Sequence, residues 1–189
     1  MEKLVSLLFA LMLSTSSLAA GWEGKVYQTP FVNDWDHEVD FSCPDGMFIV
    51  GVYSMHHNHY EDRRFKFRCV RFRNVSQKSC KWTKWLNNWD RPVNFTCPDD
   101  GFLVGVNSIH HNHYEDRKFK YQCCAMYSGA NKLIPSRCTQ SDYTQYDSVI
   151  NFTVPRGNAM TGVTSHHHNH YEDRQYSFRF CQAKLTGRH

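Results

Sequence analysis

Apolar and polar residues alternate along short segments of this chain, and no window shows the 3.6-residue apolar period of an amphipathic helix. The alternation is clearest over residues 64–69, where phenylalanine or cysteine alternates with arginine or lysine. Successive side chains of a β-strand point to opposite faces of the sheet, so this pattern is typical of a strand with one buried face. The chain is therefore predicted to be all-β.

The same pattern occurs three times along the sequence. Residues 35–69 recur at 89–123 with 23 of 35 positions identical, and more loosely at 146–180. One octapeptide, His-His-Asn-His-Tyr-Glu-Asp-Arg, is identical in all three copies, at 56–63, 110–117 and 167–174. Self-similarity of this kind predicts a repeated structural unit. We expect one domain over residues 21–189, divided into repeats at about 22–73, 74–130 and 131–189.

Each repeat is predicted to contain about four short strands. The first strands are expected at 25–29, 80–85 and 138–143, and the second at 39–43, 93–97 and 150–154. The third strands are expected at 49–55, 103–109 and 160–165, and the fourth follows the octapeptide. Twelve strands from three similar units predict a pseudo-threefold closed architecture, either a β-trefoil or a β-prism, which leaves few exposed edges.

The first twenty residues are typical of a signal peptide. Lys3 supplies a basic start, residues 4–13 are almost all apolar, and small residues follow up to a cleavage site after Ala19 or Ala20. This run is too short for a membrane span, and no later segment is long enough. The mature chain is expected to be secreted and extracellular, without membrane insertion. Three sequons add candidate N-glycosylation sites at Asn74, Asn94 and Asn151.

Eight cysteines in an exported chain predict a disulfide framework. The repeats suggest the pairing, because cysteines are absent two at a time at matched positions. Val154 and Phe180 stand in the third repeat where the first two have cysteines, and Val26 and Val70 stand in the first where the others have them. The predicted bridges are Cys43–Cys69, Cys97–Cys123, Cys80–Cys124 and Cys138–Cys181.

An element of the form Asp-Arg-x-aromatic-x-aromatic begins at Asp62, Asp116 and Asp173. Together with an upstream Phe-x-Cys-Pro and the paired cysteines 123–124, it resembles the dermatopontin family over nearly all of the mature chain. The resemblance implies a secreted, disulfide-bonded matrix protein that binds proteoglycans, supports cell adhesion and has agglutinating, lectin-like invertebrate relatives. Phe or Tyr stands here where tryptophan is usual, and the loop before Asp-Arg is rich in histidine.

The octapeptide is predicted to be a loop that binds glycans. Loops usually vary most, yet here the loop is identical in three copies while the strands around it differ. Amide, carboxylate and guanidinium groups suit vicinal hydroxyls, and an aromatic ring suits the apolar face of a pyranose. The predicted glycan-binding residues are His56, His57, Asn58, His59, Tyr60, Glu61, Asp62, Arg63, His110, His111, Asn112, His113, Tyr114, Glu115, Asp116, Arg117, His167, His168, Asn169, His170, Tyr171, Glu172, Asp173 and Arg174.

Two other interpretations of the octapeptide remain open. His-x-His on an extended chain places both rings on one face, so a metal- or mineral-binding matrix protein is the first alternative. Its ligands would be His57, His59, His111, His113, His168 and His170. The second alternative is a structural scaffold acting through protein contacts, in which Asp62-Arg63 and its copies form an ion pair that fixes the turn and Tyr60 covers the end of the barrel.

Three similar sites predict multivalent binding to glycans, proteoglycans or glycosylated cell surfaces, with other matrix proteins as further partners, and agglutination by a single molecule. No cofactor is required on this interpretation, although the histidines allow a divalent metal. A net charge of +4 suits acidic glycans, and nucleic acid is not expected as a partner. Polar residues in triplicate, without a nucleophile–base motif, argue against an enzyme.

Overall fold

The computed structural model describes residues 21–186, and all regular structure in that range is β-strand. The all-β prediction is confirmed. The predicted signal peptide, residues 1–20, lies outside the described residues and stays a prediction. None of the described residues forms a helix that could cross a membrane. The strands are β1 (Trp22–Gln28), β2 (Val39–Ser42), β3 (Met47–His57), β4 (Asp62–Phe72), β5 (Ser76–Trp82), β6 (Val93–Thr96), β7 (Phe102–His111), β8 (Asp116–Ser128), β9 (Asn131–Gln140), β10 (Ile150–Thr153), β11 (Asn158–His168) and β12 (Asp173–Leu185).

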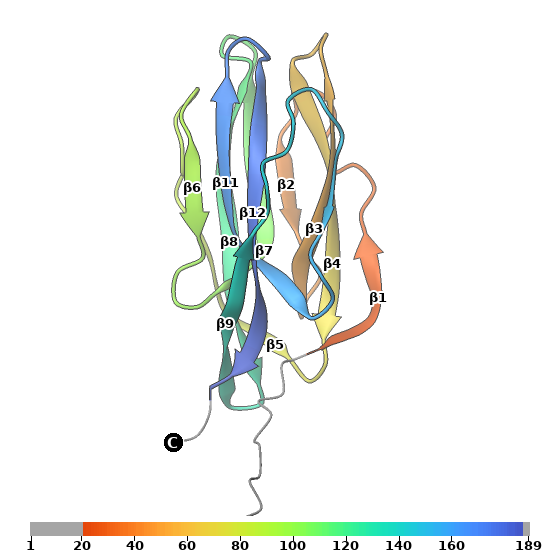
Figure 1. Cartoon of the computed structure of the whole chain (residues 1–189), viewed down its shortest axis with the longest axis vertical. Helices are drawn as coiled ribbons and strands as arrows, with labels where there is room; N and C mark the ends of the chain where they lie inside the picture. Colours follow the sequence, from red (N-terminus) through yellow and green to blue (C-terminus); the bar gives the residue numbers. More distant parts are fainter. Residues whose placement is uncertain (1–20, 187–189) are drawn as a thin grey trace, which may run out of the picture.

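Three long antiparallel hairpins, β3–β4, β7–β8 and β11–β12, form the frame of the molecule. The first strand of each repeat pairs with its own hairpin: β1 with β4, β5 with β8 and β9 with β12. The short second strand pairs with the hairpin of a different repeat: β2 with β7, β6 with β11 and β10 with β3. Each hairpin and its two flanking strands are called a unit below. The strand transfers run in a closed cycle, because each repeat gives one strand and receives one. The three hairpins run along the long axis of the molecule (Figure 1).

Glycines in the hairpins allow the transferred strands to approach. A Cβ atom built on Gly51 would lie 2.6 Å from the carbonyl oxygen of Phe152 on β10. One built on Gly105 would lie 2.9 Å from the carbonyl oxygen of Phe41 on β2. Real Cβ atoms do not approach a backbone oxygen so closely, so a larger residue at either position would push the transferred strand away.

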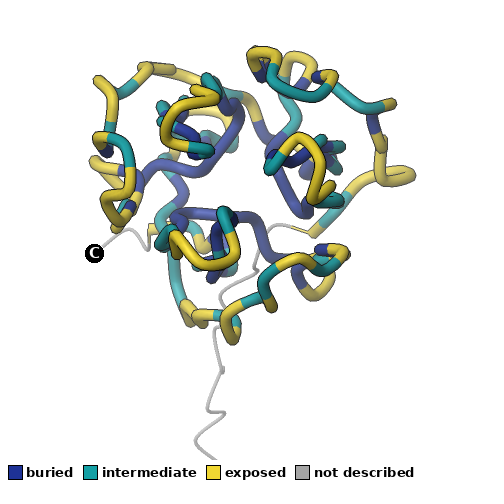
Figure 2. The backbone as a smooth tube through the Cα atoms, turned by 90° about the horizontal axis from the view of Figure 1, so that it is seen from above, coloured by how far each residue is buried: buried dark blue, intermediate teal, exposed yellow. Residues whose placement is uncertain are grey.

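Apolar side chains of the three hairpins meet along the long axis of the molecule. Seen along that axis, three groups of strands surround a centre, with buried residues inside and exposed residues outside (Figure 2). Phe65 and Phe119 each make edge-to-face contacts with Tyr176, with ring centroids 6.4 Å and 6.1 Å apart. These rings come from the fourth strand of each repeat, where the sequence alternation predicted buried side chains, and each is 5% exposed or less. Their burial contributes about 1.5–3 kcal/mol per side chain.

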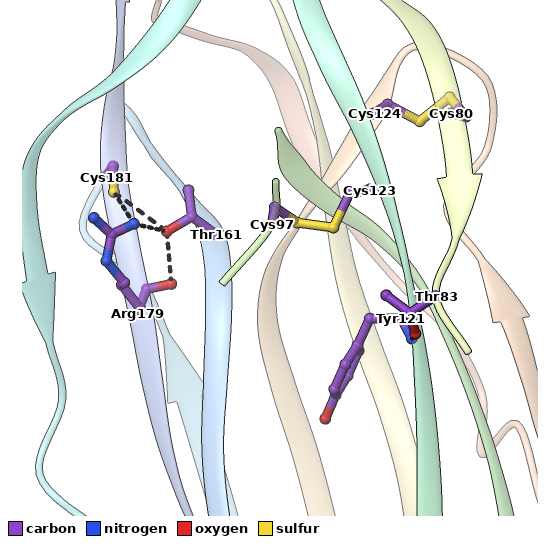
Figure 3. Close-up of a disulfide and its surroundings, with 9 residues drawn as sticks. All are labelled: Cys80, Thr83, Cys97, Tyr121, Cys123, Cys124, Thr161, Arg179 and Cys181. Atoms are coloured by element: carbon purple, nitrogen blue, oxygen red, sulfur yellow. Dashed lines mark hydrogen bonds between the residues drawn. A yellow bond between two sulfur atoms is a disulfide. The ribbon is translucent and has the colours of Figure 1, made fainter. Parts of the chain in front are cut away.

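The four predicted disulfides are all present: Cys43–Cys69, Cys97–Cys123, Cys80–Cys124 and Cys138–Cys181. Neighbouring residues Cys123 and Cys124 of β8 reach Cys97, just after β6, and Cys80 on β5 (Figure 3). Because β6 belongs to the third unit, the Cys97 bridge joins two units, whereas the Cys80 bridge lies within one.

The first strand of each repeat lies earlier in the chain than predicted. It ends at Gln28, Trp82 or Gln140, and an irregular segment follows it along the hairpin. Side chains supply part of the ladder there: the backbone N–H groups of Thr29 and Thr83 donate to the carbonyls of Phe67 and Tyr121, while their hydroxyl groups accept hydrogen bonds from the backbone N–H groups of those two residues. Sequence alternation does not reveal where a strand ends in this way, because a threonine hydroxyl can accept the hydrogen bond that a backbone carbonyl of a regular strand would accept.

Candidate functional site

Each octapeptide forms the turn of a long hairpin and part of both adjoining strands. In the first repeat, β3 ends at His57 and β4 begins at Asp62, so four residues form the turn. The last turn residue has positive φ in all three copies: 43° at Glu61, 44° at Glu115 and 42° at Glu172. The three turns lie at one end of the molecule, opposite the described chain ends (Figure 1). The predicted loops therefore come together on one face.

The last two octapeptide residues form a closed set of ion pairs between repeats. Arg117 donates two hydrogen bonds of 2.6 Å and 2.7 Å to the two carboxylate oxygens of Asp62. Arg174 and Asp116 pair in the same way at 2.6 Å and 2.8 Å. The third pair, between Arg63 and Asp173, has two bonds of 2.6 Å. We call these six residues the ion-pair ring, since each repeat gives its aspartate to one neighbour and its arginine to the other.

The ion-pair ring is buried and fully hydrogen-bonded at its carboxylates. Its six residues are between 2% and 4% exposed. Each aspartate also accepts a backbone N–H bond of 2.8–2.9 Å, as from Asp36 to Asp62. Burial would raise the pKa of Asp116, but the His167 ring 3.3 Å away and the hydrogen bonds from Arg174 outweigh it and lower that pKa to about 2. The ring therefore holds charged aspartates that bind the three repeats together.

The ion pair expected within each Asp-Arg dipeptide does not form; the aspartate and the arginine each pair with a residue of another repeat. Asp62 pairs with Arg117, not with Arg63. Consecutive residues of a strand point to opposite faces, which separates the two side chains. The scaffold interpretation of these residues nevertheless fits their burial, because side chains exposed by 4% or less offer almost no surface to a glycan.

The first histidine of each octapeptide is also buried, between carboxylates of two repeats. The side chains of His56, His110 and His167 are each 1% exposed. In His110, Nδ1 lies 3.4 Å from Asp36 and Nε2 lies 3.6 Å from Glu115. Burial lowers the pKa of His110. In His167, burial is outweighed by the charged carboxylate of Asp116, 3.3 Å from Nδ1, which raises the pKa.

The turn glutamates converge with the ion-pair ring on one small axial pocket of about 20 Å³, lined in part by Glu61, Glu115 and Glu172. Burial is the largest cause of a raised pKa at Glu115, and the charges of Asp36 and Glu61 add to it. Burial also raises the pKa of Glu61, as do the charges of Asp147 and Glu172. The mutual influence of these carboxylates shows that the bases of the three turns adjoin one another.

The outer part of each turn is an exposed aromatic cluster. Tyr60 is 38% exposed and stacks on Trp35, with ring centroids 5.6 Å apart. His57 lies 5.2 Å from Tyr60 and His59 lies 5.1 Å from it. We call such a cluster a tip. The other two tips are equivalent, formed by Trp89, His111, His113 and Tyr114, and by Tyr146, His168, His170 and Tyr171.

The predicted His-x-His metal pair does not have the expected strand geometry. His59 lies in the turn, and its backbone N–H donates to Nδ1 of His57 over 3.2 Å. The two ring centroids are 6.4 Å apart and nearly perpendicular. Each of these pairs sits instead in an aromatic cluster, as His57 does against Trp35 at 5.3 Å.

Sequence reasoning missed the residues just before the short second strands. Trp35, Trp89 and Tyr146 supply one ring of each tip, and the following Asp36, Asp90 and Asp147 face the buried histidines. An aromatic residue followed by aspartate at the same place in every repeat was the available signal. The sequon residues Asn74, Asn94 and Asn151 are exposed, which is compatible with glycosylation at each.

These features define a class: a disulfide-bonded, all-β chain that displays three equivalent clusters on one end. The sequence profile of the dermatopontin family matches residues 33–185, and the chain belongs to that family.

The chain is 38% identical over 160 residues to a hemagglutinin/amebocyte aggregation factor of Limulus polyphemus, and the aligned region covers 84% of this chain and 90% of that protein. It is 33% identical over 153 residues to a dermatopontin of Biomphalaria glabrata, covering 80% and 99%. It is 34% identical over 150 residues to Millepora cytotoxin-1 of Millepora dichotoma, covering 79% and 65%. No solved structure matches the chain. The relatives thus include a hemagglutinin and a dermatopontin.

Proposed function

We propose that this protein is a secreted, non-enzymatic adhesion protein of the extracellular matrix that binds glycans through its three tips. The observation that carries the proposal is the threefold display of one exposed aromatic cluster on a single end of the molecule. A pyranose can place its apolar face on Tyr60, whose exposed ring is held in place by Trp35. Asn58, exposed beside it, offers both a donor and an acceptor for sugar hydroxyls.

The proposal narrows the set of residues that contact the glycan. The exposed members of each octapeptide are its second to fifth residues, with the half-buried glutamate at their inner edge. The buried histidine, aspartate and arginine support the tip from below. The ligand-contacting residues are therefore His57, Asn58, His59 and Tyr60 and their equivalents His111, Asn112, His113, Tyr114, His168, Asn169, His170 and Tyr171.

The strand pairing also favours a β-prism over a β-trefoil as the architecture of this protein. Three units, each made of a long hairpin with a strand on either side, surround the axis, and a short pairing of β8 with β9 joins the second and third units into one eight-stranded sheet. The cyclic transfer of β2, β6 and β10 supports a closed pseudo-threefold arrangement.

The position of the tips changes how multivalency would work. With all three tips on one end, a single molecule would hold one polyvalent surface by three contacts, which can raise avidity by about 10²–10⁴ over a single site. Bridging two cells would then need a second molecule joined through another face. A strictly monomeric preparation should coat glycan-bearing particles without clumping them, and a crosslinked dimer should agglutinate them.

A glycan-binding panel tests the proposal, with and without chelator, at pH 5.5 and pH 7.5. The double variant Asn58→Ala with Tyr60→Ala changes one tip and should lower the number of sugar molecules bound per chain by about one third. The same pair of changes in all three repeats should abolish binding. Tyr27→Ala is the matched control, because Tyr27 is 45% exposed on β1 and belongs to no tip. Normal sugar binding by the three-repeat variant, or no binding by the wild-type chain across the panel, would reject the glycan function and favour a scaffold acting through protein contacts.

A further inference from the structure

The buried histidines leave ring nitrogens without protein partners, a costly arrangement in a folded protein. Among residues 21–186, neither ring nitrogen of His56 or His110 has a hydrogen-bond partner, and Nδ1 of His167 has none. The carboxylate oxygen Oδ1 of Asp36, which faces His110, is buried and unpartnered too. A buried polar group left unpaired loses the hydrogen bonds that it makes to water in the unfolded chain, so it disfavours the folded state unless a ligand supplies the missing partner. At least one unpartnered ring nitrogen occurs in the first histidine of each of the three octapeptides.

The arrangement fits a cation at each junction. Each histidine lies with two aspartates of a neighbouring repeat, and the ligand atoms of each group lie within 4.8 Å of one another. Nδ1 lies 3.4 Å from Asp147 in His56 and 3.4 Å from Asp36 in His110. In His167 the ring is placed differently: Nδ1 lies 3.3 Å from Asp116, and Nε2 lies 3.8 Å from Asp90. Ligands bound at about 2.0–2.2 Å in a tetrahedral zinc site lie at about this separation from each other.

The other ring nitrogen has the partner that a metal-binding histidine usually has. Nε2 lies 3.6 Å, 3.6 Å and 3.2 Å from the glutamate of the same turn, in His56, His110 and His167 respectively. Metal-ligating histidines commonly donate their second N–H to a carboxylate, which fixes the tautomer and the ring orientation. Glu61, Glu115 and Glu172 occupy that position here, and each is held at positive φ.

The charges of the region also favour a cation. The three histidine groups and the turn glutamates together contain nine carboxylates, whereas the ion-pair ring supplies three guanidinium groups. The cluster therefore has an excess of six negative charges when its histidines are neutral, in a chain whose net charge is +4. Three divalent cations would balance that excess. The nine carboxylates are Asp36, Asp62, Asp90, Asp116, Asp147, Asp173, Glu61, Glu115 and Glu172.

We propose that each junction between repeats binds one divalent transition-metal cation, with one ring nitrogen of the first octapeptide histidine and two aspartates of the neighbouring repeat as ligands. The three sites are His110 with Asp36 and Asp62, His167 with Asp90 and Asp116, and His56 with Asp147 and Asp173. Imidazole together with carboxylate favours zinc or a similar metal over calcium, which takes oxygen ligands. Because every site takes ligands from two repeats, the cations would tie the units together beneath the tips. The proposal does not depend on glycan binding.

Calorimetric titration of zinc into the metal-free, full-length chain tests the proposal. The wild-type protein should bind three zinc ions, and Asp36→Asn should reduce the number to two. Asp36→Asn, Asp90→Asn and Asp147→Asn together should leave none. Asparagine tolerates the positive φ of these positions, 61°, 57° and 53°, so the variants are expected to fold. A thermal melt without metal verifies that they do.

The exposed histidines provide the matched control. His59→Gln, His113→Gln and His170→Gln together keep the carboxylates and should still bind three zinc ions. Loss of zinc binding in this variant, unchanged stoichiometry in the three-aspartate variant, or no zinc binding by the wild-type chain would each overturn the proposal. A parallel titration with calcium serves as a second readout: calcium binding of equal stoichiometry that survives His56→Gln, His110→Gln and His167→Gln would overturn the assignment of imidazole as a ligand.

Discussion

The octapeptide consists of two regions with opposite surroundings, although both are identical in all three repeats. Its last two residues, such as Asp62 and Arg63, are 3% and 2% exposed and form the ion-pair ring. Its tip is exposed at Tyr60 and contacts other residues of its own repeat, such as Trp35. The first region joins the repeats and the second does not. Sequence identity within one short motif can therefore have two separate physical causes, and the following changes distinguish them.

The largest effect is expected from breaking the ion-pair ring. Arg117→Ala leaves Asp62 as a buried charge without its bidentate partner and should lower the free energy of unfolding by about 3–5 kcal/mol. Denaturant unfolding measures the loss. Lys184→Ala, at an exposed position of β12, serves as the control and should change stability by about 0.5 kcal/mol or less.

The double variant Asp62→Ala with Arg117→Ala sharpens the same test. Removing both partners leaves no unpaired charge, so it should cost less than the sum of the two single variants. An additive result would mean that the two side chains contribute independently, contrary to the bidentate pairing.

A somewhat smaller loss is expected in acid. The pKa of Asp116 is lowered from 3.8 to about 2, so the folded chain binds a proton less readily than the unfolded chain. The contribution of the Asp116 carboxylate to the free energy of unfolding is fully present above pH 3.8 and is lost as the pH falls through about 2. It amounts to about 2 kcal/mol for this group. Unfolding curves between pH 5 and pH 2, with NMR titration of the Asp116 carboxyl, measure it, and a titration near pH 4 would contradict the burial and pairing described.

Changes at the tips should have a modest effect on stability. Tyr60→Ala removes a ring stacked on Trp35 and should cost about 0.5–1 kcal/mol. The equivalent changes at Tyr114 and Tyr171 should cost about the same, and the three should add, because each tip contacts its own repeat. Thermal melts of the single and triple variants check this. A cost comparable to that of Arg117→Ala would show that the tips are structural as well.

The smallest effect, of opposite sign, is expected at the axial glutamates. Burial and neighbouring carboxylates raise the pKa of Glu115, so its charged form is disfavoured by folding. Glu115→Gln should therefore raise stability at pH 7 by a few tenths of a kcal/mol. The measurement is made in chelator, so that bound cations do not mask the repulsion. A lower stability would indicate that the glutamate charge has a favourable partner.

Several parts of this structure could be predicted from the sequence, because alternation within a segment and comparison between the repeats both reveal them. Alternation identified the fourth strands, and matched losses such as Val154 with Phe180 identified all four disulfides. The exchange of β2, β6 and β10 between repeats could not be predicted, because pattern alone does not encode which hairpin a strand joins. The pairing of Asp62 with Arg117 follows from that exchange. Alternation alone could have excluded the pairing of Asp62 with Arg63, since adjacent strand residues face opposite ways.

The three transferred strands are not anchored in the same way. Cys43, just after β2, and Cys97, just after β6, are each bonded to a hairpin of another unit. At the third junction the equivalent positions are Val154 and Phe180, buried but not covalently linked. Each of these bridges joins a transferred strand to the hairpin of its own repeat, so β2 and β6 stay beside β4 and β8 even when their pairing with β7 and β11 is broken. No bridge holds β10 to β12, so once its pairing with β3 is broken, β10 can move away from its own hairpin as far as the connecting chain allows.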